Sequence, residues 1–396
     1  MYYETNQAYH CDMRNRFLFS AASPLLTIVV YIVVLVAVVA AVAVDTTMTS
    51  LTPAAIQSAA SALAIGEPGT PWGVLEKQKW RESRIPSRSY FDDIVPRIQA
   101  IREQHADDFV VVQYGNLPQY QDNDKNDDKA TTTTCSSFPL FAIRTKQWSK
   151  SKPSVLITGG VHGYETSGVE AALEFIEHGT AQQYAHRGFN ICVCPCISPW
   201  GYERHQRWNA EAVDPNRSFN PDGTIVAGRS FNPEPATAES AAVLHFLRTT
   251  MATLMGTDGD VGWTVHIDLH ETTDTDNTEF IPAKAKRDGH VPTTRPDAIP
   301  DGFYLVQDTT APQPAWFAAM IAKVRTVTHI APPDAQGKLI GEDVTMDGVI
   351  GIPSNRALGL CAGVTSAPYR VSFVIIYLFF RNGIRNRSNA KNVLLG

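Results

Sequence analysis

The sequence predicts an α/β protein, because short buried strands alternate with amphipathic helices through its central part. Residues 155–158 form an apolar, β-branched run followed by two glycines, as expected for a buried strand that ends in a turn. Residues 167–176 then carry apolar side chains at helical spacing. The same signals return in an amphipathic segment, 237–254, and in a strand-like run, 265–271.

The other elements and the general class follow from similar patterns. Helices are expected at 85–106 and 313–328, strands at 109–114, 138–144 and 358–362, and a polar loop at 332–346. With 396 residues, 44% of them hydrophobic, the chain has ample material for one large domain. Its formal charge of −6 and the lack of a basic stripe give no reason to expect a nucleic-acid partner.

His162 and Glu165 stand at the predicted turn between the strand and the helix. A histidine and a carboxylate at such a junction can point into one cleft and offer a nitrogen and an oxygen to one Zn²⁺. The same spacing also suits a solvated histidine and a glutamate that the helix dipole stabilises in the first turn. The pair alone does not decide between these interpretations.

Two further stretches carry the residues that decide it. The polar segment after the apolar run 191–197 contains Arg207, Asp214, Asn216 and Arg217, and His270 lies near the end of the run VHIDLHE. In this order the residues resemble the zinc carboxypeptidases of the carboxypeptidase A type. The DLHET run is also similar to the related succinylglutamate desuccinylase and aspartoacylase group.

The resemblance, which covers roughly residues 90–369, implies an α/β/α sandwich around a mixed, mainly parallel sheet. His162, Glu165 and His270 match the three ligands of one Zn²⁺. Arg207 matches the arginine that polarises the scissile carbonyl, and Asp214 matches the carboxylate behind the first histidine. Asn216 and Arg217 match the pair that binds the terminal carboxylate of the substrate.

These roles imply a hydrolase that removes C-terminal residues from peptides. Three protein ligands leave zinc an open position, where the pKa of water falls to about 7. The planar fork of Arg217 suits a carboxylate. Two alternatives remain: a zinc-dependent deacylase of N-acyl amino acids, and a module that binds zinc and carboxylates without turnover. The expected substrate is therefore a peptide or an N-acyl amino acid with a free carboxylate.

A membrane anchor is predicted near the N-terminus. Residues 25–44 carry no charge, and as a helix of about 1.5 Å per residue they would span about 30 Å, the thickness of a bilayer core. Arg14 and Arg16 precede the run, which predicts a cytoplasmic N-terminus and an extracytoplasmic catalytic domain. The alternative is a signal peptide cleaved near Ala43, which would make the protein secreted.

The expected organisation has five parts: a cytoplasmic tail (1–23), the anchor (24–44), a stalk or extension rich in Ala, Ser, Thr and Pro (45–84), the zinc carboxypeptidase-like domain (85–370) and an aberrant tail (371–396). The apolar start of that last tail is too short to span a bilayer, which needs about 20 residues. An interfacial helix is one interpretation of the tail, and a gene-model or splicing artefact is the favoured one.

The resemblance also implies a general base. The family uses a glutamate near the C-terminal end of the domain, but here no Asp or Glu follows Asp347. Glu271 is the nearest substitute, yet on a strand it would point away from the face of its neighbour His270. Because a lost general base costs about 10²–10⁴ in rate, we expect this chain to hydrolyse peptides poorly or not at all.

Overall fold

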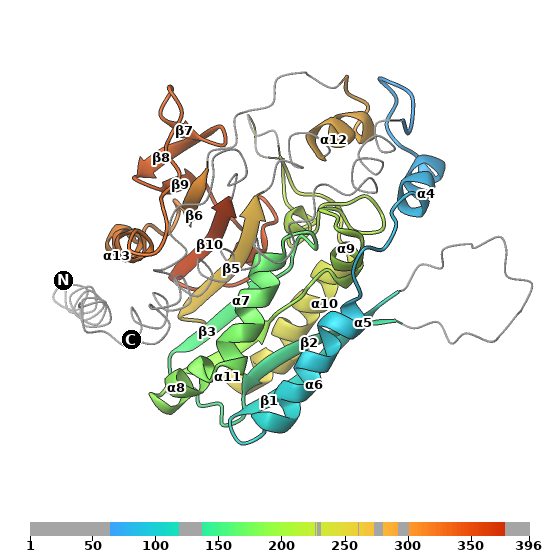
Figure 1. Cartoon of the computed structure of the whole chain (residues 1–396). Helices are drawn as coiled ribbons and strands as arrows, with labels where there is room; N and C mark the ends of the chain where they lie inside the picture. The colour runs from blue at the N-terminus through green and yellow to red at the C-terminus, as the bar shows by residue number, and fades with distance from the viewer. Residues whose placement is uncertain are drawn as a thin grey trace, which may run out of the picture.

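The computed structural model describes residues 64–118, 137–225, 227, 231–259, 261–272, 280–291 and 301–376. Its strands are β1 (Phe109–Leu117), β2 (Phe138–Thr145), β3 (Ser154–Gly159), β4 (Asn190–Cys194), β5 (Val265–Thr272), β6 (Gly302–Asp308), β7 (Lys338–Leu339), β8 (Glu342–Met346), β9 (Val349–Ile352) and β10 (Tyr369–Ile376). Figure 1 shows the strands crossing the middle of the molecule.

The helices connect these strands. They are α4 (Val74–Glu82), α5 (Tyr90–Asp93), α6 (Val95–Gln104), α7 (Thr166–Glu177), α8 (Thr180–His186), α9 (Pro199–Arg204), α10 (Ala238–Phe246), α11 (Ala252–Met255), α12 (Ile281–Arg287) and α13 (Pro314–Val324). A π-helical stretch, Leu247–Met251, joins α10 to α11, and short 3-10 turns cover Pro215–Arg217 and Cys361–Gly363.

The sheet is mixed, with its parallel part at the centre. The strand order is β1-β2-β4-β3-β5-β10-β6-β9-β8-β7. β4, β3, β5 and β10 run parallel to one another, whereas β2 on one side and β6 on the other pair antiparallel with this block. The predicted fold class, an α/β protein built on a mixed sheet, is confirmed.

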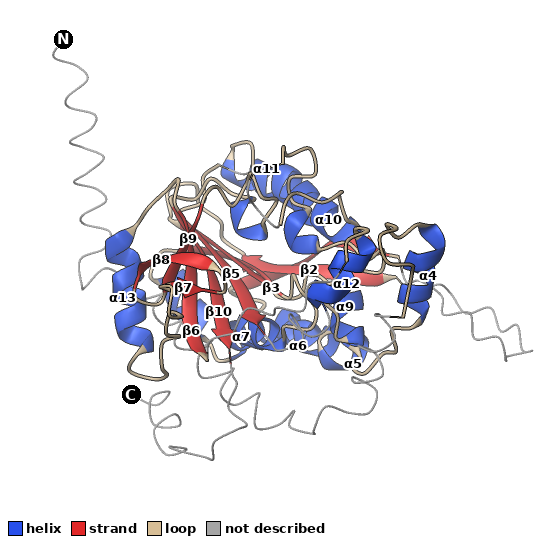
Figure 2. Cartoon of the chain, turned by 90° about the horizontal axis from the view of Figure 1, so that it is seen from above, coloured by secondary structure: helices blue, strands red, loops and turns tan. Residues whose placement is uncertain are grey.

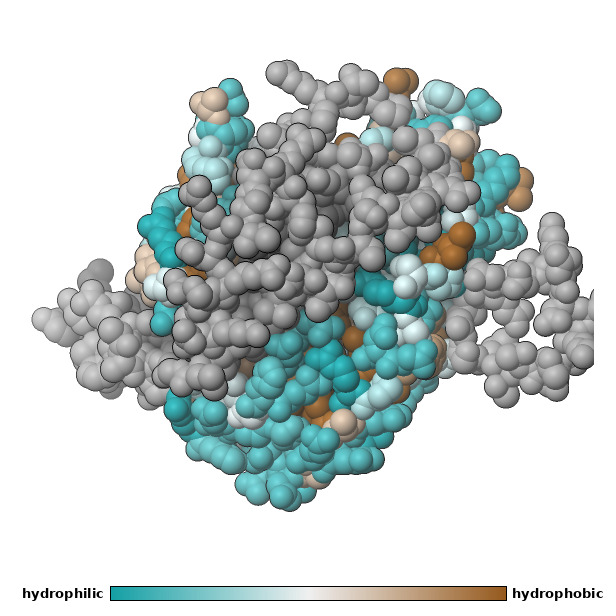
Figure 3. Space-filling model, in the orientation of Figure 1, coloured by the Kyte–Doolittle hydropathy of each residue, from teal (hydrophilic) through white to brown (hydrophobic). Residues whose placement is uncertain are grey.

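Helices cover both faces of the sheet, which makes the α/β/α sandwich that the resemblance implied. Viewed from above, α10 and α11 lie on one face and α5, α6 and α7 lie on the other (Figure 2). α7 matches the helix predicted at 167–176, and its Val169, Leu173 and Ile176 are buried as expected. The outer surface of the α6–α8 layer is mainly hydrophilic (Figure 3).

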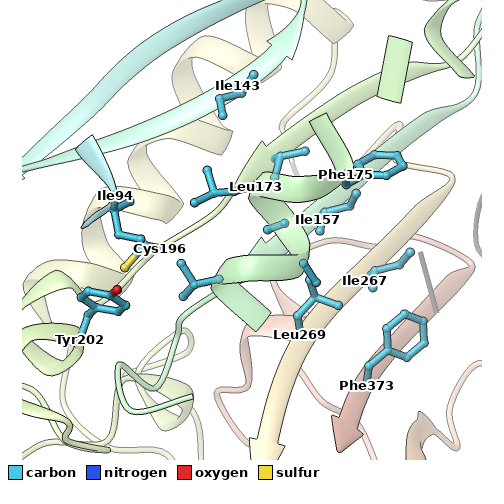
Figure 4. Close-up of a cluster of buried hydrophobic side chains, with 14 of the residues drawn as sticks. Ile94, Ile143, Ile157, Leu173, Phe175, Cys196, Tyr202, Ile267, Leu269 and Phe373 are labelled. Carbon is cyan, nitrogen blue, oxygen red and sulfur yellow. The ribbon is translucent and has the colours of Figure 1, made fainter. Parts of the chain in front are cut away.

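The alternation of side chains along β5 decides what each face carries. Val265, Ile267 and Leu269 belong to the same apolar cluster as α7, and Figure 4 shows two of them beside the helix. Successive residues of a strand point to opposite faces. Asp268 and His270 therefore point to the face away from α7.

The predicted C-terminal boundary is wrong. Residues 371–376, expected to begin an aberrant tail, form most of β10, which lies between β5 and β6 near the centre of the sheet. Val371 and Phe373 are fully buried and Val374 is 6% exposed. The apolar run has no polar face because a central strand is covered on both faces. The rest of the predicted tail, 377–396, lies outside the described residues.

Two smaller assignments are also wrong. Residues 358–362, predicted as a strand, form turns and the start of a 3-10 turn. Residues 332–346, predicted as a loop, contain β7 and β8. β8 is only half-buried, so its polar composition resembles that of a loop.

Part of the segment predicted as a loose extension packs against the domain. α4 lies within 45–84, and its Trp80 is buried against Trp200 and Trp208, with ring centroids 5.5 and 5.6 Å apart. This contact depends on single large side chains, which the average composition of the segment conceals. Residues 45–63 lie outside the described part of the chain.

The described residues do not support the predicted membrane localisation. Within the described residues, no helix has both the length and the apolar character needed to cross a membrane. The expectation of a single-pass membrane protein with an extracytoplasmic catalytic domain is therefore withdrawn. The segment 24–44, on which it rested, lies outside the described residues.

Candidate metal centre

The loop between β3 and α7 brings His162 and Glu165 to the C-terminal edge of the parallel strands. Gly160 turns the chain with a φ of +59°, a conformation that glycine adopts without strain. Gly163 lies so close to the next loop that a Cβ atom there would come within 2.0 Å of the Gly201 backbone. The sequence HGYE therefore fixes a narrow loop in which the second residue has no room for a side chain.

The structure brings the three predicted ligands together. Nδ1 of His162 lies 2.6 Å from one carboxylate oxygen of Glu165, and Nδ1 of His270 lies 2.7 Å from the other. One ligand atom from each residue lies within 4.8 Å of the other two, and all three side chains are buried. The two imidazoles thus converge on one carboxylate from different segments of the chain.

Each histidine is held from behind by a second carboxylate. Nε2 of His162 lies 2.9 Å from Asp214, and Nε2 of His270 lies 2.8 Å from Asp268. A carboxylate on the far ring nitrogen is the usual support of a metal-binding histidine. Two nitrogens and one carboxylate form the donor set of catalytic zinc sites, so these residues fit a divalent metal ion.

The prediction did not include Asp268. The sequence did contain a feature that points to Asp268, because Asp268 and His270 are two residues apart on a strand and therefore share a face. The sequence alone did not give the rotamer that turns the carboxylate toward Nε2.

The charges at the site also suit a cation. Burial would raise the pKa of Glu165, but His162 and His270 outweigh it and lower this pKa to about 2. Burial likewise opposes ionisation of Asp214, but Arg207 and His162 hold its pKa well below the usual range. Burial would lower the pKa of His270, but Asp268 and then Glu165 raise it to about 10. The centre is therefore rich in ionised carboxylates, which favour positive charge between the imidazoles.

A buried polar network lies behind Asp268. The hydroxyl of Thr158 donates to Oδ1 of Asp268 at 2.7 Å. Since that hydroxyl has one hydrogen, Nε2 of His266, 3.1 Å away, must donate to Thr158. Burial lowers the pKa of His266 to about 4, so its imidazole is neutral near physiological pH. The network fixes the carboxylate that orients His270.

Arg207 lies one carboxylate away from His162. Its Nε donates to Oδ2 of Asp214 at 3.2 Å, while Oδ1 of the same carboxylate faces His162. The guanidinium carbon lies 4.5 Å from the ring centroid of Phe280. The predicted carbonyl-polarising residue is therefore held beside the candidate ligands, although its catalytic role stays a prediction.

Asn216 and Arg217 lie next to the centre and make contacts within the protein. The amide nitrogen of Asn216 lies 3.3 Å from Nε2 of His270, and its amide oxygen accepts from the backbone of Cys361 at 2.7 Å. Arg217 donates to the carbonyl of Asn216 at 2.6 Å, and its guanidinium carbon lies 5.1 Å from the ring centroid of Phe231. Their role in binding a substrate carboxylate stays a prediction.

Glu271 and Val374 bear on the expected loss of the general base. Glu271 points to the α7 side, where its carboxylate accepts from the N–H and the hydroxyl of Ser167 at 3.3 and 2.9 Å. Val374 pairs in register with His270 on the neighbouring parallel strand. Because Phe373 faces the α7 side, Val374 faces the side of His270. An aliphatic side chain thus stands beside the candidate ligand His270.

Residues 151–299 match the family model of the succinylglutamate desuccinylase/aspartoacylase catalytic domain. This range includes every residue of the candidate centre except Val374. Over these residues the chain is similar to that group, as the DLHET run predicted. A search of curated proteins gives no significant match.

Solved structures with a similar fold share little sequence with the chain. A candidate metallopeptidase of Shewanella amazonensis is 17% identical over 71% of this chain and 82% of its own, with a TM-score of 0.44. A metallo-carboxypeptidase of Burkholderia cenocepacia is 13% identical over 72% of this chain and 59% of its own, with a TM-score of 0.37. Bovine thrombin-activatable fibrinolysis inhibitor, solved with a tick carboxypeptidase inhibitor, is 14% identical over 74% and 87%, with a TM-score of 0.39.

Proposed function

We propose that the chain is a zinc-dependent hydrolase that acts at the C-terminus of peptides. The observation that carries the proposal is the convergence of His162, Glu165 and His270 on one buried point, with a carboxylate behind each imidazole. The chemistry that zinc supplies in such a site is activation of water at neutral pH. The protein contributes the ligands, their orientation and a buried setting.

Two arginines support the choice of substrate. Arg207, held beside His162 through Asp214, is suited to stabilise negative charge that develops on a carbonyl oxygen. One such donor is worth about 10²–10³ in rate. Arg217 is suited to a free carboxylate because its planar fork can donate two parallel hydrogen bonds. Together they favour cleavage next to a terminal carboxylate.

The match over residues 151–299 favours a second candidate, removal of an acyl group from an N-acyl amino acid. Such a reaction would use the same ligands and the same carboxylate-binding arginine. A third candidate, a zinc and carboxylate-binding module without turnover, is favoured by Val374, which puts an aliphatic side chain beside His270.

A substrate panel separates the three candidates. Zinc-loaded protein is incubated with peptides that have a free or an amidated C-terminus and with N-acyl amino acids, and released amino acids are measured. We expect slow release of the C-terminal residue from the free peptides and none from the amidated ones. Cleavage of the N-acyl amino acids alone would support the second candidate. Bound zinc without cleavage of any substrate would support the third.

A further inference from the structure

Tyr164 stands between two ligands of the metal-binding loop and reaches Arg207 with its hydroxyl. The hydroxyl accepts from Nη1 of Arg207 at 3.3 Å. The tyrosine ring lies nearly parallel to the ring of His162, with centroids 6.1 Å apart and planes at 17°. The backbone N–H of Tyr164 donates to the carbonyl of Gln206, and the side chain is only 3% exposed. The two loops that carry His162 and Arg207 are therefore joined at both backbone and side chain.

Contacts with Asp214, Tyr164 and Phe280 restrain the direction of the Arg207 guanidinium. Its Nε donates to Asp214, its Nη1 donates to Tyr164, and its plane lies near the ring of Phe280. Because the guanidinium is planar and its donors are rigidly arranged, hydrogen bonds from two of its nitrogens restrict its tilt.

The contacts close into a ring of four residues. His162 touches Asp214, Asp214 touches Arg207, Arg207 touches Tyr164, and Tyr164 stacks on His162. The position of the guanidinium relative to the candidate ligand is thus fixed along two independent routes. Such precision matters, since a displacement of about 1 Å in a catalytic group can cost about 10² in rate.

We propose that Tyr164 is a positioning residue whose hydroxyl aims Arg207 at the substrate carbonyl. This inference rests on the proposed function, which gives Arg207 the task of stabilising negative charge there. A phenylalanine would keep the stacking on His162 but would leave Nη1 of Arg207 without this acceptor. The hydroxyl, and not the ring, is therefore the group that the proposal concerns.

A double-mutant cycle tests the proposal without requiring turnover. Zinc-loaded wild type, Tyr164→Phe, Arg207→Gln and the double variant are titrated with a peptide phosphonate that has a free C-terminal carboxylate. The phosphonate carries the negative oxygens that a carbonyl acquires during hydrolysis. We expect Tyr164→Phe to weaken phosphonate binding by about tenfold, the loss typical of a hydrogen bond to a charged group. In the Arg207→Gln background the same change is expected to have no effect.

Two controls distinguish a loss of Arg207 positioning from a loss of zinc binding or of overall stability. Zinc affinity, measured by competition with a chelator, is expected to stay within about twofold in Tyr164→Phe, because the ligands and Asp214 are unchanged. Tyr90→Phe removes another buried hydroxyl, which donates to the carbonyl of Pro139 at 2.7 Å away from the centre. This variant is expected to bind the phosphonate as tightly as wild type does.

Equal phosphonate affinity of Tyr164→Phe and wild type would overturn the proposal. The proposal would also fail if Tyr164→Phe lowered phosphonate affinity equally with Arg207 present and with Arg207→Gln. If wild type does not bind the phosphonate, or if Arg207→Gln binds it normally, the proposed function of Arg207 fails instead. A crystal structure of zinc-loaded Tyr164→Phe then decides the geometric inference. A guanidinium displaced from Asp214 or Phe280 supports it, and an unmoved guanidinium contradicts it.

Discussion

Asp214 and Asp268 perform the same task on two histidines that come from distant parts of the chain. Each carboxylate accepts from Nε2 of its histidine, so that Nδ1 of the same histidine points at Glu165. The two carboxylates are held differently, since Asp214 also binds Arg207 whereas Asp268 accepts from Thr158. A change at Asp268 should therefore affect metal binding while leaving the arginine in place.

We predict that Asp268→Asn lowers zinc affinity by about 10–100-fold, the usual cost of losing the carboxylate behind a metal-binding histidine. Competition with a chelator measures the effect. The control is Asp308→Asn. Asp308 is also buried, but it ends β6 and accepts from Arg370, near the start of β10, at 2.9 Å. Its zinc affinity should match that of wild type. Wild-type affinity in Asp268→Asn would show that Asp268 does not support the ligand.

Introducing a carboxylate at Val374 tests whether the expected loss of the general base limits the rate of hydrolysis. Val374 faces the side of His270 in register with it, so a carboxylate there would stand beside the candidate ligands. We predict that Val374→Glu raises peptide hydrolysis by about 10²-fold or more, within the range that general bases contribute. Val374→Gln, with the same shape and no basic carboxylate, is the control. Equal rates in the two variants, with zinc bound to both, would contradict this role for the position.

The residues of the site differed in how far the sequence could predict them. The three ligands have short, ordered motifs, and local elements place them at strand ends, so their convergence followed from the resemblance. Asp268 and Tyr164 lie inside the same motifs, but their contacts depend on rotamers and on the approach of separate loops. The spacing of Asp268 and His270 on one strand does predict that they share a face. The rotamer of Asp268 and the approach of the loops that carry Tyr164 and Arg207 have no signature in a single sequence.

Among the elements, β10 shows how burial changes the interpretation of a pattern. An apolar run without a polar face is typical of a strand covered on both sides, and also of a segment that does not belong to a soluble fold. The run continues past Ile376 in the sequence, and the change in composition from the preceding domain, with basic residues beyond the run, favoured the second interpretation. The pairing of β10 with both β5 and β6 decides for the first.

We predict that a chain ending at residue 376 folds and a chain ending at residue 370 does not. The shorter chain loses the buried side chains of Val371, Phe373 and Val374, each worth about 1.5–3 kcal/mol. Their sum is comparable to the whole stability of a domain, about 5–15 kcal/mol. Thermal unfolding followed by circular dichroism compares the two forms. A cooperative transition at the same temperature in both would show that β10 is dispensable.

Segments that lie outside the sequence motifs support the loop between β3 and α7, which carries His162 and Glu165. Arg88, which precedes α5, donates to the carbonyl of Gly163 at 3.3 Å and to that of Tyr202 at 3.0 Å. Trp80 anchors α4 against Trp200 and Trp208, and Trp200 precedes Gly201, whose backbone lies close to Gly163. The alternation of strands and helices predicted the α/β class, whereas such long-range packing depends on single side chains that periodicity does not reveal.

If His162, Glu165 and His270 form one metal site, as proposed, purified protein should contain zinc in a fixed ratio to the chain. Elemental analysis of the wild type should give about one zinc per chain, because three protein ligands are the usual number in a catalytic site. His162→Ala and His270→Ala should each lose the zinc while Asp308→Asn keeps it. One zinc per chain persisting in both histidine variants would show that these histidines do not bind the metal.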